Sequence, residues 1–179
     1  MTSATTRDQA TTTGERADLL AMLAKHRHFL RFTTRDLTDD QARTRSTASE
    51  LCLGGLIKHV AAIEQGWADF IVNGPSAMGD FSSMTAEDFA KRADEFRLLP
   101  DETLAGVLAD YAEVARRTDE LVMTVSLDAT QPLPEAPWFE PGVRWSARRV
   151  FMHIVAETAQ HAGHADIIRE SLDGAKSMG

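Results

Sequence analysis

Two side chains near the C-terminus have the types and the spacing of metal ligands. Glu157 and His161 stand four residues apart in a stretch, residues 150–172, whose apolar residues recur at helical spacing. Residues four apart lie one above the other on a helix, so this carboxylate and this imidazole would converge on one point. Polar groups on a face that packs into a core need a partner, and a divalent cation is one such partner.

A third ligand has to come from another helix, and His59 is the best candidate. It lies on the apolar face of a second predicted helix, residues 51–72, three residues after Leu56 and four before Ile63. A lone histidine on an apolar stripe is more often a hydrogen-bonded core residue than a ligand. Two imidazoles and one carboxylate favour zinc, with nickel or another first-row ion as the alternative. Three protein ligands would leave one coordination position open, as in catalytic sites.

Two further histidines flank this pair on the same predicted helix. His153 precedes Glu157 by four residues, so it is a candidate catalytic base or a partner that orients a ligand. His164 follows His161 by three residues, so it is a candidate to orient that ligand or to replace Glu157, because side chains three apart also converge. Both ligand pairs, Glu157 with His161 and His161 with His164, stay open.

Aromatic and basic residues gather just before this helix. Residues 128–142 hold four of the six prolines, around Trp138 and Phe139, and predict a partly extended loop. These two aromatics and Trp145 are candidates to line the mouth of a pocket, or equally to cover the open end of the core.

Three arginines, at positions 144, 148 and 149, follow this loop around Ser146, the predicted N-cap of the last helix. The helix dipole does not favour cations at a helix N-terminus. We therefore take Arg144, Arg148 and Trp145 as candidates to bind a cofactor or the anionic group of a substrate. Pairing of the arginines with nearby acids is the alternative.

Helical periodicity predicts an all-α four-helix bundle. The four predicted helices cover residues 15–36, 51–72, 101–125 and 150–172. Residues 76–100 form a long crossover between helices two and three, so these two helices are not simple antiparallel neighbours. The pair Gly54-Gly55 is unfavourable in a helix, which indicates the close approach of a neighbouring helix or a ligand, or a late helix start.

Composition limits the possible functions. A chain of 179 residues with 43% hydrophobic and 26% charged residues is typical of one globular domain, which we place at residues 15–179 after a Thr-rich, flexible tail at 1–14.

A formal charge of −8 without a basic patch argues against a nucleic-acid partner. No apolar run reaches the length of a membrane span, and the single cysteine, Cys52, excludes an intramolecular disulfide, so we expect a cytoplasmic protein.

The sequence also resembles a known superfamily. Its similar segments are Gly54-Gly55-Leu56-Ile57-Lys58-His59 followed by Trp67, then Arg144-Trp145-Ser146, His153, Glu157 and residues 161–170. They resemble the DinB superfamily, and most closely its actinobacterial DinB-like (DUF664) branch, from about residue 15 onward. The resemblance implies a metal-binding four-helix bundle with one histidine on the second helix and two ligands four residues apart on the last. His59, Glu157 and His161 match these positions.

The resemblance also implies a function. Many relatives carry histidine where this chain has Glu157, and the Glu-x-x-x-His variant is similar to the metal site of mycothiol-dependent maleylpyruvate isomerase. Members resemble S-transferases that use mycothiol, bacillithiol or a similar small thiol, so a thiol and an electrophile are the expected partners and a homodimer is a further expectation. A bound divalent cation would lower the pKa of the thiol and hold a thiolate nucleophile.

Two other functions stay open. The bundle could bind a metal or a small molecule without turnover, since a shared fold does not establish an activity. Alternatively, His59, Glu157 and His161 could form a metal-free, hydrogen-bonded cluster in a protein that acts through dimerisation.

Overall fold

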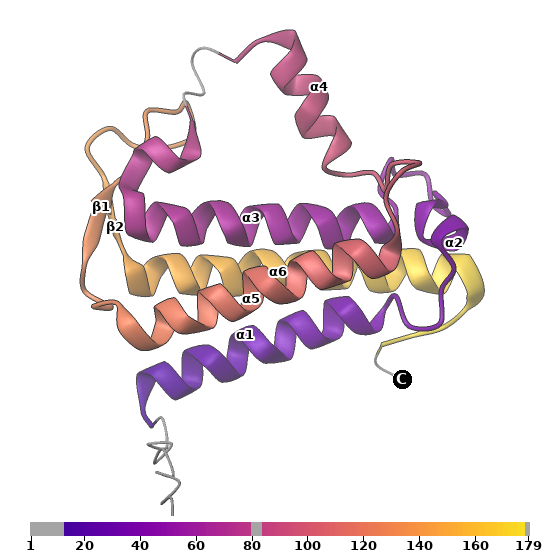
Figure 1. The fold of residues 1–179 in the computed structure, drawn as a ribbon, viewed down its shortest axis with the longest axis horizontal. Coiled ribbons are helices and arrows are strands. Elements are labelled where there is room, and N and C mark those ends of the chain that lie inside the picture. Colours follow the sequence, from indigo (N-terminus) through magenta and orange to yellow (C-terminus); the bar gives the residue numbers. More distant parts are fainter. Residues whose placement is uncertain (1–12, 80–83, 178–179) are drawn as a thin grey trace, which may run out of the picture.

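Four long helices form the body of the protein (Figure 1). The computed structural model describes residues 13–79 and 84–177. Its long helices are α1 (Glu15–Phe32), α3 (Leu53–Asn73), α5 (Leu104–Thr124) and α6 (Ala147–Asp173). The predicted all-α bundle is confirmed. The tail predicted at residues 1–14 lies, except for its last two residues, outside the described residues.

Short elements connect these helices. They are α2 (Asp39–Arg43), the 3-10 helix η1 (Gly74–Met78), α4 (Ala86–Asp94), β1 (Thr130–Pro132) and β2 (Arg144–Ser146). The strands pair antiparallel, with Gln131 opposite Trp145. The sequence predicted only a loop here, because strands of three residues are too short to show an alternating pattern. None of the described helices is long and apolar enough to cross a membrane.

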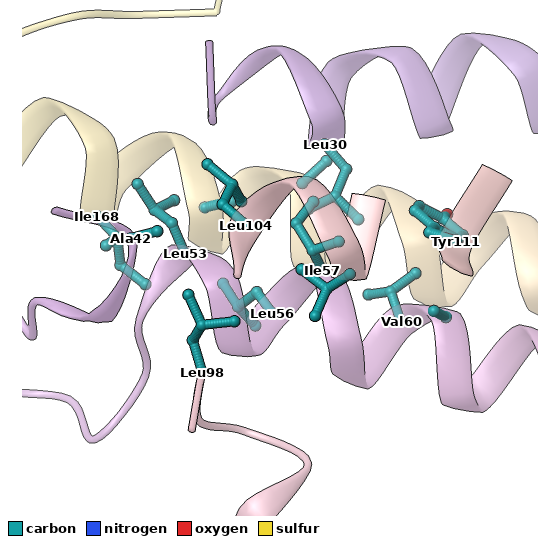
Figure 2. Close-up of a cluster of buried hydrophobic side chains, with 14 residues drawn as sticks. Leu30, Ala42, Leu53, Leu56, Ile57, Val60, Leu98, Leu104, Tyr111 and Ile168 are labelled. Atoms are coloured by element: carbon teal, nitrogen blue, oxygen red, sulfur yellow. The ribbon is translucent and has the colours of Figure 1, made fainter. Parts of the chain in front are cut away.

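The crossover makes α3 and α5 run in the same direction, while α1 and α6 run in the opposite one (Figure 1). The core shows the same arrangement. One buried cluster, near α2, joins Leu30, Leu53, Leu104 and Ile168, and so unites the end of α1, the starts of α3 and α5 and the end of α6 (Figure 2). The second cluster contains Phe70, Val122 and Val150 at the opposite ends of their helices. Helix α3 therefore packs antiparallel to α6.

Local hydrogen bonds fix where the helices begin and end. Ser146 Oγ accepts a hydrogen bond from the backbone N–H of Arg149 at 3.2 Å, which confirms it as the N-cap of α6. Thr85 and Asp88 form a reciprocal capping box at the start of α4. Helix α3 ends at Gly74, whose φ of 71° suits a residue without a side chain.

The crossover packs directly on the start of α3, at the two glycines. A Cβ atom at Gly54 would lie 2.9 Å from Cβ of Leu98, and one at Gly55 would lie 1.9 Å from the carbonyl oxygen of Phe96. The close neighbour that the glycine pair indicated is therefore the backbone after α4, rather than a helix or a ligand. Only glycine at position 55 allows the crossover to lie this close.

Two buried arginines hold the helices in register. The Arg27 guanidinium on α1 donates to both carboxylate oxygens of Glu64 on α3, at 3.1 and 2.5 Å, and to Asp119 on α5 at 2.8 Å. Glu64 is fully buried. Arg169 on α6 donates to the carbonyl oxygens of Thr33 and Arg35, just beyond the end of α1. These contacts fix α3 and α6, which carry the candidate ligands.

Candidate metal centre

The packing of α3 against α6 brings His59 and His161 together. Their ring centroids lie 5.0 Å apart and the rings are nearly perpendicular, at 87°. His161 Nε2 lies 3.7 Å from Oε2 of Glu157, one turn earlier on α6. His59 is only 9% exposed. The structure therefore groups the three residues that the sequence proposed as metal ligands.

The donor set fits a divalent cation. Two donors on a tetrahedral zinc ion, each about 2.1 Å from it, lie about 3.4 Å apart. The separation of 3.7 Å between Glu157 and His161 is close to that value. Across residues 13–79 and 84–177, no three His, Cys, Asp or Glu side chains are already arranged as a complete metal site. Small side-chain rotations would have to bring the third donor, His59, to the pair.

Burial keeps the imidazoles in the form that a metal requires. Burial, together with the neighbouring His161 and Arg92, lowers the pKa of His59 to about 4. Burial also lowers the pKa of His161, while Glu157 opposes this shift. At neutral pH both rings are therefore uncharged and each keeps a lone pair for a cation.

His153 lies on the other side of Glu157. Its Nε2 is 3.6 Å from Oε1 of Glu157, so this carboxylate stands between two imidazoles. Two stacked indoles, Trp67 and Trp145, contact His153 edge-on, with centroid distances of 4.8 and 5.2 Å. Burial lowers the pKa of His153, and Glu157 works against that shift. Among the predicted cofactor-binding residues, Trp145 therefore reaches the cluster through His153.

The structure does not bring the two predicted arginines to this cluster. Arg148 precedes Glu157 by nine residues, which places it about half a turn away on the opposite face of α6. Its guanidinium pairs with Glu15 and with Asp128. Arg144 on β2 donates to the side chain and the carbonyl oxygen of Thr130. For Arg148 the alternative that the sequence left open, pairing with nearby acids, describes the contacts.

His164 contacts the centre from its exposed edge. Its Nδ1 lies 3.5 Å from Nδ1 of His161, and the side chain is exposed. Within the described residues, a ring contact with His59 is found for His161 and not for His164. The separation of 3.5 Å also suits two donors on one zinc ion, so His164 stays a candidate either to orient His161 or to replace Glu157 as a ligand.

Sequence reasoning missed the contribution of the crossover to this site. The Phe96 ring stacks on the His59 ring with a centroid distance of 3.8 Å, and Oε2 of Glu95 lies 3.8 Å from His59 Nδ1. The crossover had no periodic pattern that would assign it to the site. The signal that could have located it is the Gly54-Gly55 pair, on which this segment packs.

A separate cavity of about 970 Å³ lies between α1 and α5. Arg27, Arg31 and Leu108 are among its lining residues, and none of the candidate ligands lines it. The histidine cluster, which carries the candidate ligands, therefore stays the candidate site, although this cavity is larger than a ligand pocket needs to be.

Comparison with known proteins shows the family of the chain. No curated protein matches the chain. Residues 18–174 match the family described as Mycothiol-S-transferase, and this range includes every candidate ligand. The chain therefore belongs to the mycothiol S-transferase family, within the DinB-like superfamily.

Proposed function

We propose that this protein is a divalent-metal-dependent thiol S-transferase that joins mycothiol to an electrophilic small molecule. The family supports mycothiol as the thiol. The observation that carries the metal is the buried, uncharged His59 beside the pair of His161 and Glu157.

His59, Glu157 and His161 would hold a zinc or nickel ion, which would lower the pKa of a bound thiol and stabilise its thiolate. His153 can take up the thiol proton, because its lowered pKa leaves it neutral at pH 7. Glu157, 3.6 Å from His153 Nε2, would stabilise the imidazolium that forms. Trp67 and Trp145 supply an apolar wall next to His153, where the electrophile could pack away from water.

Metal content tests the first half of the proposal. Protein purified without a histidine tag or chelator should contain about one equivalent of zinc or nickel by elemental analysis, and the His59→Ala variant should contain almost none. His28→Ala is the matched control, because His28 is an exposed α1 histidine that stacks on Phe32 and lies away from the cluster. Equal metal in the wild type and the His59→Ala variant would refute the ligand assignment.

Thiol consumption tests the second half. The metal-loaded protein should conjugate mycothiol to electrophiles such as epoxides or activated aryl halides, and His153→Ala should slow this reaction while retaining the metal. Stoichiometric metal without turnover of any electrophile would instead support a binding protein. A wild type that binds no zinc or nickel would support the metal-free cluster.

A further inference from the structure

Among residues 13–79 and 84–177, no group forms a hydrogen bond with the buried Nδ1 of His59. An unpaired buried polar atom is costly, so a neighbouring group is expected to satisfy it. The carboxylate of Glu95, on the crossover, is the acid that approaches it: Oε2 is 3.8 Å from Nδ1, a few tenths of an ångström beyond hydrogen-bond range. The Glu95 side chain is 37% exposed, so it has room to rotate and close this gap.

The crossover is built to hold Glu95 at this place. The absent side chain of Gly55 lets the Phe96 carbonyl rest on α3, and the thiol of Cys52 lies 3.8 Å from the same carbonyl oxygen. The Phe96 ring then covers the His59 ring at 3.8 Å. Glu95 is thereby directed at the edge of an imidazole whose face is already covered.

We infer that Glu95 is a positioning residue that accepts a hydrogen bond from His59 Nδ1–H and so leaves Nε2 with its lone pair for the cation. This inference rests on the proposed function, because it assigns a role toward the proposed metal. Histidine ligands commonly donate their second ring N–H to a carboxylate, which fixes the tautomer and the ring orientation.

The tautomer of His59 tests this role without any metal. In metal-free wild type at pH 7, nitrogen-15 NMR of the imidazoles should show His59 protonated at Nδ1. Glu95→Ala should release the ring to the Nε2–H form, whereas Glu95→Gln should retain Nδ1–H, because the amide oxygen is still an acceptor. A wild-type His59 protonated at Nε2 would overturn the inference.

Zinc affinity, measured by competition with a chromophoric chelator, tests the consequence for the metal. Glu95→Ala should weaken zinc binding about 10- to 100-fold, and Glu95→Gln should restore most of that loss. Glu87→Ala is the matched control, because Glu87 is an exposed α4 acid that pairs with Lys91 at 2.9 Å. It should bind zinc like the wild type.

The outcomes separate this inference from the proposed function. If the Glu95→Ala variant binds zinc within about twofold of the wild type, the role assigned to Glu95 is wrong, but the proposed metal site is not contradicted. If the wild type binds no zinc, the proposed function fails, and the tautomer in the metal-free protein still decides whether Glu95 positions His59. Circular dichroism of each variant shows whether the bundle is intact, and Glu95→Gln preserves the size of the side chain if Glu95→Ala does not fold.

Discussion

The chemistry of a buried polar residue in this protein is set by its neighbours. His59 and Glu64 lie on one helix and are both at most 9% exposed, but their surroundings differ. Glu64 forms an ion pair with the guanidinium of Arg27. His59 meets His161 and a phenyl ring, so its neutral form is favoured. The same helix thus holds a structural charge and an uncharged candidate ligand.

The lowered pKa of His59 predicts how stability depends on pH. As the pH falls below 6.5, the unfolded histidine binds a proton, whereas the folded one does not until about pH 4. The contribution of His59 to the free energy of unfolding is therefore fully present above pH 6.5 and should fall by about 3 kcal/mol between pH 6.5 and pH 4. Charged and titratable neighbours of His59 are Glu95, His161 and Arg92.

Chemical denaturation of the metal-free protein across this pH range measures the effect. The His59→Asn variant lacks the titrating ring, so its stability should depend less steeply on pH than that of the wild type. Parallel curves for the two proteins would show that His59 does not carry the dependence.

The ion pair between Arg27 and Glu64 gives a second prediction for individual residues. Arg27→Met should lower the free energy of unfolding by about 3–5 kcal/mol, because it leaves the buried Glu64 carboxylate without its partner. Adding Glu64→Leu should recover much of the loss, since both charges are then removed. Urea denaturation measures both variants.

Arg116→Met is the control, because the pairs of Arg116 with Glu113 and Glu120 are exposed. It should leave the urea midpoint unchanged. A double variant less stable than Arg27→Met alone would mean that the buried pair contributes more than charge compensation.

At the scale of elements, the crossover is part of the site as well as a connection. Its end, residues 95–98, packs on the first turn of α3 and covers His59. The two glycines lower the stability of the helix, but because they have no side chains, this segment can pack against the start of α3.

Alanine substitutions at two glycines of α3 distinguish the effect of a glycine on helix stability from its effect on the packing of the crossover. Gly55→Ala should destabilise the protein and weaken zinc binding, because its Cβ would collide with the Phe96 carbonyl oxygen. Gly66→Ala should raise the free energy of unfolding by about 0.5–1 kcal/mol and leave zinc binding unchanged. A Cβ atom at this position would lie within 4 Å of no atom of the neighbouring described residues. Thermal melts and chelator competition measure the two properties. Equal behaviour of the variants would contradict the proposed packing of the crossover.

At the scale of the whole molecule, the candidate ligands connect helices that are far apart in the sequence. His59 is on α3, whereas Glu157 and His161 are on α6, so a cation held by all three would join the two helices. Such a cation binds the folded chain more tightly than the unfolded one and should stabilise the bundle.

Zinc should therefore raise the melting temperature. At a free zinc concentration about 100 times the dissociation constant, the stabilisation is about 2.7 kcal/mol, which corresponds to about 5–11 °C for a chain of this size. Differential scanning calorimetry with and without zinc measures the shift. His161→Ala should abolish it and His28→Ala should retain it. A wild-type melting temperature that zinc leaves unchanged would argue against a cation between α3 and α6.

Several features followed from local sequence alone. Periodic leucines and valines determined the four long helices, because the side chains of one helix face repeat every 3.6 residues whatever the helix packs against. Ser146 marked the start of α6 through a hydrogen bond within one turn. The spacing of Glu157 and His161 placed both on one face for the same reason. The family resemblance, in turn, led from these residues to the mycothiol S-transferases.

Tertiary structure alone decided the rest. It paired Arg148 with Glu15 and Asp128, placed Trp145 beside His153 and packed Glu95 and Phe96 against His59. Apart from Trp145 and His153, which are eight residues apart, these contacts join residues that are far apart in the sequence. Their geometry depends on how the helices, the strands and the crossover pack, which no local pattern specifies. The neutral state of His59 belongs to the same class, because desolvation depends on every element that excludes water from the ring.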